Sequence, residues 1–228
     1  MTPDASLQVR DLHGWYGESK ALHGMNFEIG RGEVVTLLGR NGAGKTTTLR
    51  AIMGLLRKKT GEIRFRGEEL CGRLPEYVAR RGIAIFSSLT VEENLMLPPV
   101  VAEGGMAMDD ILALFPNLAE RRNSPGTKLS GGEQQMLAIA RILRTGATLL
   151  LLDEPTEGLA PVIVKQIGAV IAKLKERGFT VLLVEQNFRF AAKLADRHYV
   201  VEDGRVVESF TAADVAGGID RIETYLRV

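Results

Sequence analysis

One short loop constrains this chain more than any other feature. Every fixed position of the pattern G-x-x-x-x-G-K-[ST] is filled by Gly39, Arg40, Asn41, Gly42, Ala43, Gly44, Lys45 and Thr46. Residues 33–38 before it are typical of a buried strand, and residues 47–56 after it of a helix. Between these flanks the loop amides can wrap a phosphate chain, and the helix dipole favours the anion. A glycine-rich turn that matches by chance is the alternative, and the flanks disfavour it. The sequence therefore predicts a P-loop that binds a nucleoside triphosphate.

Strand and helix patterns alternate along the rest of the chain. This alternation is typical of a mainly parallel α/β sheet with helices on both faces. The sequence predicts strands at 7–16, 21–29, 61–66, 82–86, 148–152, 180–184, 198–201 and 205–208. It predicts helices at 75–81, 108–118, 130–144, 162–176, 188–195 and 219–226, and a helix N-cap at Thr90.

Composition narrows the class of partner. The formal net charge is +1, so there is no electrostatic case for nucleic acid as the main ligand. Cys71 is the single cysteine, which suits a reducing compartment. Residues 1–6 lack a signal-peptide pattern, and no apolar stretch approaches the length that spans a bilayer. Work at a membrane would therefore require a partner.

A second signal is the apolar run 149–152, which ends in Asp153 and Glu154. Ligands of open α/β sheets gather at the carboxyl ends of the strands. There Asp153 can hold Mg²⁺, and Glu154 can orient or deprotonate an attacking water. Solvated acids at a strand end are the alternative, which the upstream P-loop disfavours.

A third signal is the run Ser130, Gly131, Gly132 and Glu133, which opens the helix before the acid-tipped strand. Ser130 and Glu133 fit an ordinary capping box. The same turn can also cradle a phosphate with amides, a hydroxyl and the helix dipole. Leu129 to Gln135 resembles the signature motif of ABC proteins, so the whole chain resembles an ABC-transporter ATP-binding subunit.

The resemblance implies roles for individual residues. Residues 39–46 and Thr47 would bind ATP, with Tyr16 stacking on adenine, although Tyr16 also fits a core aromatic at a strand end. Thr46 and Asp153 would hold Mg²⁺, and Glu154 and Lys45 would act in hydrolysis. Residues 155–161 match a loop that contacts a second subunit. In the family two ATPs lie in a head-to-tail dimer, so residues 130–133 would complete the partner's site.

One departure concerns Gln186. The family usually carries a histidine after this strand, whereas here Val184 and Glu185 precede a glutamine. Glutamine can hydrogen-bond a γ-phosphate or position water, but it carries no charge. This variant resembles the branched-chain amino-acid importer branch, as do residues 157–161 and 225–228. An ordinary polar residue near a helix start is the alternative.

A second departure is a missing segment. The family carries a loop near residues 82–95 that senses Mg²⁺ and the γ-phosphate and contacts the membrane partner. Its expected Val-Pro-Glu-Gly-Arg-like stretch is absent between Ala84 and Ile85. Either the stretch is deleted, or residues have been omitted from the sequence. The integrity of the other motifs favours omission, and no residue here is given the loop's role.

Together these signals predict one ABC ATP-binding domain over residues 1–228. It would have a P-loop core (1–88 and 137–228), an antiparallel β edge and an inserted helical subdomain (89–136). The expected function is ATP hydrolysis, with ATP and Mg²⁺, that powers import of branched-chain or related amino acids. Expected partners are a second ATPase subunit, identical or different, transmembrane permease subunits and, indirectly, a solute-binding protein. The expected location is the cytoplasmic face of the membrane. A soluble nucleotide-gated ABC protein, a weakly hydrolysing binding module and an exporter ATPase stay open.

Overall fold

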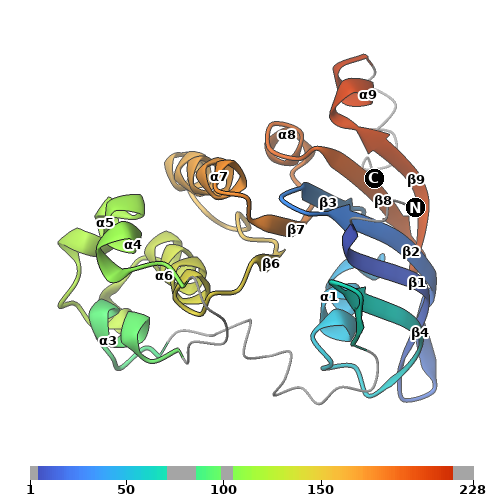
Figure 1. Cartoon of the computed structure of the whole chain (residues 1–228), viewed down its shortest axis with the longest axis horizontal. Helices are drawn as coiled ribbons and strands as arrows, with labels where there is room; N and C mark the ends of the chain where they lie inside the picture. The colour runs from blue at the N-terminus through green and yellow to red at the C-terminus, as the bar shows by residue number, and fades with distance from the viewer. Residues whose placement is uncertain (1–4, 71–85, 99–104, 218–228) are drawn as a thin grey trace.

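The computed structural model describes residues 5–70, 86–98 and 105–217 (Figure 1). The strands in this part are β1 (Ala5–Tyr16), β2 (Ser19–Gly30), β3 (Val34–Leu38), β4 (Lys58–Phe65), β5 (Glu68–Glu69), β6 (Leu149–Asp153), β7 (Thr180–Glu185), β8 (Arg197–Glu202) and β9 (Arg205–Thr211). The helices are α1 (Lys45–Ile52), α3 (Val91–Met96), α4 (Met108–Leu114), α5 (Pro116–Glu120), α6 (Gly131–Arg144), α7 (Pro161–Glu176), α8 (Phe188–Ala191) and α9 (Ala212–Gly217).

The central sheet has the order β6-β7-β3-β8-β9. Its first four strands pair in parallel, and β9 returns antiparallel to β8 through a tight turn. Strands β3 and β7 are buried at every position, as expected for parallel strands covered on both faces. The sequence prediction of a mainly parallel sheet is confirmed, as is the hairpin at its edge.

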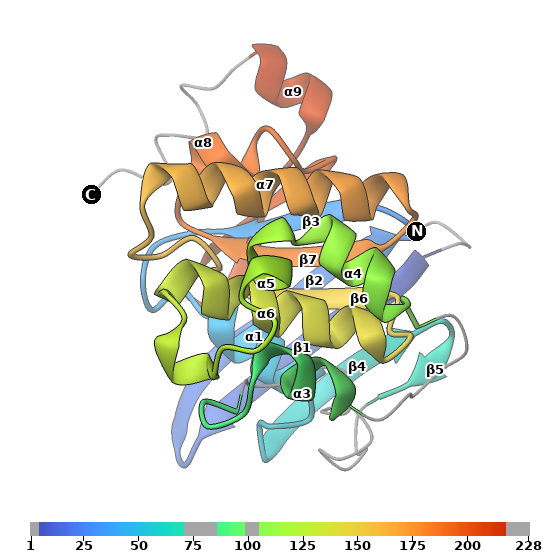
Figure 2. The ribbon, with the colours of Figure 1, turned by 90° about the vertical axis from the view of Figure 1, so that its left-hand side faces the viewer.

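The two faces of the central sheet contact different layers. Val34, Leu150 and Leu152 belong to a core shared with α6 and α7, and Figure 2 shows α7 lying across that face. Val35 and Leu37 point the other way, because side chains alternate along a strand. They belong to a core that includes α1 and the N-terminal strands. Helix α1 therefore lies between two sheets.

This second layer differs from the expectation of helices on both faces. Strands β2-β1-β4-β5 form a separate antiparallel sheet. The sheet covers α1 and one face of the central sheet through a common apolar core. The expected antiparallel edge is therefore a second sheet, which also includes β4 and β5.

Helices α3, α4 and α5 pack against α6. Thr90 caps α3 and Ser130 caps α6, each in a capping box with a glutamate three residues on. These helices share one buried core with β6, β7 and α7. The expected subdomain boundary after residue 136 falls inside α6.

Three predicted helices are wrong in extent. The predicted helix 47–56 begins at Lys45 and ends at Ile52. The predicted helix 108–118 breaks at Phe115, whose φ of −122° and ψ of 74° are not helical. The cause is Pro116, because a proline ring disfavours helical geometry in the residue before it. The predicted helix 188–195 ends at Ala191. Expectations for residues 71, 75–81, 82–85 and 219–226 fall outside the described residues. Among the described helices, none combines the length and apolarity needed to cross a membrane.

Candidate functional site

The P-loop joins β3 to α1 at the carboxyl edge of the central sheet. Gly44 precedes α1 with φ of 107° and no side-chain cap. That backbone conformation favours glycine, and the uncapped helix leaves its first N–H groups available to an anion. A Cβ on Gly39 would overlap the Val201 carbonyl oxygen, so the loop also needs glycine to pass beside β8. A cavity of about 260 Å³ lies here, lined by residues 40–43 and 200–203.

Lys45 is almost fully buried, with 4% of its surface exposed. Its Nζ donates to the carbonyl oxygens of Gly39 at 2.7 Å and Arg40 at 3.0 Å. It also lies 3.7 Å from Oε1 of Glu154. Burial lowers the pKa of Lys45, and the Glu154 carboxylate opposes that shift. The ammonium therefore sits between the loop and the acidic strand end.

Thr46 and Asp153 meet at the same edge. The Thr46 hydroxyl donates to Oδ1 of Asp153 at 3.1 Å. Burial raises the pKa of Asp153, and this hydrogen bond opposes the shift. Hard oxygen donors suit Mg²⁺, and neighbouring ligands in an octahedral shell of about 2.1 Å radius lie about 3 Å apart. The two oxygens therefore fit a magnesium ion.

Glu154 and Gln186 are in direct contact. Nε2 of Gln186 donates to Oε1 of Glu154 at 2.8 Å. The backbone of Glu154 has φ of 44°, which is uncommon for a residue with a side chain. Its N–H donates to the Val184 carbonyl oxygen at 2.9 Å, which fixes that turn. The carboxylate is thus held by an uncharged donor beside Lys45.

Glu185 is a site neighbour that the sequence analysis did not identify. It is 3% exposed, and its Oε1 accepts from the Thr156 hydroxyl at 2.7 Å. Its Oε2 accepts from the backbone N–H groups of Gln186 and Asn187 at 3.2 and 3.3 Å. Burial raises the pKa of Glu185, and these hydrogen bonds oppose the shift. Glu185 thereby links the turn after Glu154 to the turn that carries Gln186.

Tyr16 ends β1 and is 45% exposed. Its hydroxyl lies 3.4 Å from Nη1 of Arg50 on α1, a helical turn beyond Thr46. The structure thus places an exposed aromatic ring near the P-loop helix. Thr47, also expected to contact nucleotide, is half-buried on the first turn of α1.

The signature residues lie on a different part of the molecule. Ser130 Oγ accepts from the Glu133 N–H at 3.3 Å, and Glu133 accepts from the Ser130 N–H at 2.8 Å. Gly132 is buried, and a Cβ there would overlap the Ile163 side chain of α7. Figure 1 shows α6 well separated from α1. One chain therefore carries two candidate phosphate cradles that do not form a single site.

Comparisons with known proteins agree with this geometry. Residues 22–157 match the ABC transporter family. The chain is 47% identical to BraG of Pseudomonas aeruginosa, a high-affinity branched-chain amino acid transport ATP-binding protein, over 91% of this chain and 93% of BraG. It is 33% identical to LptB of Haemophilus influenzae, a lipopolysaccharide export system ATP-binding protein, over 92% of each chain.

A solved structure gives the same fold. The ATP-binding cassette MJ0796, dimeric in a post-hydrolysis state with ADP and Pi, superposes with a TM-score of 0.77 at 27% identity. The match covers 90% of this chain and 98% of that one. The chain belongs to the ABC transporter family of ATP-binding subunits. It is an ATPase of that family, whose ATP hydrolysis is coupled to transport.

The missing segment is a property of the chain. The full sequence of 228 residues runs continuously from Ala84 to Ile85, so the expectation of omitted residues is wrong. The alignment with BraG spans 217 positions but covers only 91% of 228 residues, which is about 207. About ten alignment positions therefore face gaps in this chain. Residues 84 and 85 fall outside the described residues.

Proposed function

We propose that this chain is the ATP-hydrolysing subunit of an importer for branched-chain or related amino acids. The observation that carries the proposal is the 47% identity with BraG over nearly the whole of both chains. The replacement of histidine by Gln186, in hydrogen-bond contact with Glu154, fits the same branch. Similarity to LptB shows that relatives also serve export, so the direction and the solute belong to the proposal.

The proposed mechanism follows from the contacts at the sheet edge. The loop amides and Lys45 neutralise the outer phosphates, which requires Lys45 to exchange its bonds to the loop carbonyls for phosphate oxygens. Thr46 and Asp153 would hold Mg²⁺, which would supply positive charge to stabilise the phosphates when bound. Glu154 aligns or deprotonates the attacking water, and Gln186 orients the Glu154 carboxylate and supports the γ-phosphate.

We further propose that two such subunits, identical or different, close over two ATPs. The Ser130–Glu133 turn of one subunit would then complete the phosphate site of the other, while Tyr16 stacks on adenine. The two subunits would act on transmembrane permease subunits at the cytoplasmic face of the membrane. A solute-binding protein would deliver the solute to the permease. Residues 1–228 would form one domain, with residues 89–136 as its helical subdomain.

The test of the hydrolytic site is Glu154→Gln, with Glu176→Gln at the exposed end of α7 as control. Glu154→Gln keeps the shape of the side chain but removes the base. We expect unchanged ATP binding and a loss of turnover of at least about 100-fold, whereas Glu176→Gln keeps both. Near-normal turnover in Glu154→Gln would refute the assigned role.

The solute is tested separately. Cells that carry Lys45→Ala are expected to lose uptake of labelled leucine and to keep uptake of a sugar. Unchanged uptake of leucine, isoleucine and valine would refute the assignment as an importer of these amino acids. It would not affect the assignment as an ATPase.

A slow ATPase that acts mainly as a nucleotide-gated binding module is a second candidate, favoured by the stretch that is absent from the sequence between Ala84 and Ile85. It predicts ATP binding with little turnover. Inserting the corresponding BraG residues between these two positions would then raise turnover, and an unchanged rate would remove this candidate.

A further inference from the structure

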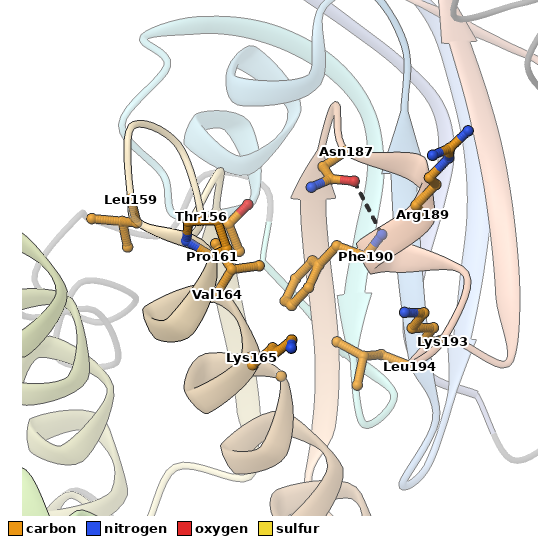
Figure 3. A pocket seen from close by; sticks show the side chains of 11 residues that line it. Thr156, Leu159, Pro161, Val164, Lys165, Asn187, Arg189, Phe190, Lys193 and Leu194 are labelled. Atoms are coloured by element: carbon orange, nitrogen blue, oxygen red, sulfur yellow. Dashed lines mark hydrogen bonds between the residues drawn. The ribbon is translucent and has the colours of Figure 1, made fainter.

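A larger cavity lies away from the P-loop, between α7 and the segment that begins with α8 (Figure 3). Its volume is about 580 Å³, which is in the range of small-molecule sites. Figure 3 shows the Phe190 ring reaching from α8 toward α7, with Leu194 below it. A Cβ on Gly168 would lie 3.1 Å from that ring, so glycine allows the close approach. Leu159, Val164 and these two side chains make the lining largely apolar.

Three cations border this apolar lining. Lys165 comes from α7, and Arg189 and Lys193 come from α8 and the turn after it. All three are exposed. No acidic residue is among the eleven that line the cavity. Within the part of the chain that the structure describes, none of the three forms an ion pair, in contrast to Lys175 nearby, which pairs with Asp196.

We propose that this cavity is a binding site for a small organic anion with an apolar body, such as an aliphatic carboxylate. The apolar lining takes the hydrocarbon part, whose burial is favourable, and the bordering cations take the carboxylate. An amino acid fits poorly, because its ammonium group would be desolvated without a carboxylate partner. The same absence of acids disfavours an organic cation.

The cavity is connected to the hydrolytic edge through two of its lining residues. The Thr156 hydroxyl donates to the buried carboxylate of Glu185. Asn187 directly follows Gln186, and its N–H donates to the same carboxylate. An occupant of the cavity therefore contacts both turns that hold Glu154 and Gln186. We infer that the anion changes the rate of ATP hydrolysis, a step that rests on the proposed roles of those two residues.

Binding is tested by calorimetric titration with decanoate, and with decyltrimethylammonium as the probe of opposite charge. We expect decanoate alone to bind. The double variant Lys165→Gln with Lys193→Gln should lower the affinity for decanoate about tenfold. This is the loss expected when two partly exposed ion pairs to the carboxylate are removed. Val164→Trp keeps every charge and fills the cavity, so it should abolish binding. Lys173→Gln, an exposed lysine elsewhere on α7, is the matched control and should bind normally.

Equal binding of both probes, or equal binding of decanoate to all variants, would overturn the site, because either result indicates nonspecific adsorption. Light scattering in the presence of ATP measures dimerisation, and so tests whether a second copy of the chain covers the cavity instead of a small anion. Loss of dimerisation in Val164→Trp, together with no binding of decanoate by the wild-type chain, would indicate that this face is a protein interface. That result would overturn the proposed anion site as well.

The link to hydrolysis has its own readout. Saturating decanoate is expected to change kcat about fivefold in the wild-type chain and in Lys173→Gln. It should leave the kcat of Val164→Trp unchanged, because that variant does not bind decanoate. Decanoate that binds with the expected variant pattern but leaves kcat unaltered would overturn the link. Absence of turnover before decanoate is added would instead count against the proposed hydrolytic function.

Discussion

The stability of this fold should fall in mild acid because of one buried histidine. His198 lies on β8 with no exposed surface. Its Nδ1 is 2.7 Å from the Thr36 hydroxyl, and its ring packs edge-on against Phe188. Its Nε2 has no hydrogen-bond partner among the described residues. A proton on this ring would place a charge in the core, so burial lowers the pKa of His198 to about 4, and attraction to the Asp196 carboxylate opposes that shift only in part.

The magnitude follows from the difference between the folded and unfolded pKa values. The unfolded imidazole takes up its proton near pH 6.5, whereas the native ring takes it up near pH 4. Between these values the unfolded chain binds more protons, so stability rises with pH there and is lost as the pH falls. The contribution is fully present above pH 6.5. Between pH 7.5 and pH 5 the free energy of unfolding should decrease by about 2 kcal/mol through this group.

The assay is urea unfolding of the nucleotide-free protein at pH 7.5 and pH 5, followed by circular dichroism. His198→Asn retains an amide that can hydrogen-bond Thr36 but removes the titrating ring. The variant loses packing and is less stable at both pH values. The decisive quantity is the difference between the two pH values, which should be about 2 kcal/mol smaller than in the wild-type chain. His23→Asn, on the exposed face of β2, is the control and should keep the wild-type difference.

Two results would refute this reasoning. One is a His198→Asn variant whose stability depends on pH as steeply as the wild-type protein. The other is an NMR titration of the native His198 ring with a midpoint above pH 6, because burial would then not exclude the charged form.

Three further substitutions test the site and the packing around it. Lys45→Ala removes the cation beside the loop and should weaken ATP affinity at least about tenfold; unchanged affinity in an equilibrium binding assay would contradict the P-loop assignment. Gly132→Ala forces a methyl group into α7 and should cost about 1–3 kcal/mol, whereas Gly131→Ala, whose Cβ would stand 3.6 Å from its nearest neighbour, should cost less than about 0.5 kcal/mol. Asn94→Ala leaves Arg141 and several backbone groups buried without this partner and should cost about 3 kcal/mol in urea unfolding; a loss below about 1 kcal/mol would mean that water replaces the amide.

The local features of the fold were predictable where a short pattern has one physical solution. The P-loop spacing fixed a strand, a loop and a helix, because only that order aims N–H groups at a phosphate. Ser130 and Glu133 predicted a helix start, since the two residues satisfy each other's backbone. The break at Phe115 was also predictable from Pro116. The sequence prediction missed it because it followed helical periodicity alone.

Longer-range features were not predictable from pattern. Alternating strands and helices indicate a parallel sheet, but they do not say which layer covers its second face. The pairing of β1 with β4 builds the second sheet that covers this face. The paired residues lie about fifty positions apart in the sequence, so a local pattern does not reveal the pairing. The position of Glu185 is a similar case. From the sequence alone, a carboxylate at a strand end is expected to be solvated. Only the structure shows that Thr156, 29 residues away, lies beside Glu185 and donates a hydrogen bond to it.

The separation of the two cradles on α1 and α6 has a genetic consequence. In the paired arrangement proposed above, each nucleotide site takes its P-loop from one copy and its signature turn from the other. A copy with Lys45→Ala and a copy with Ser130→Ala then place both defects in the same site when they pair. The other site of that mixed pair is intact, so the two alleles should complement each other partially, although each homodimer has two damaged sites.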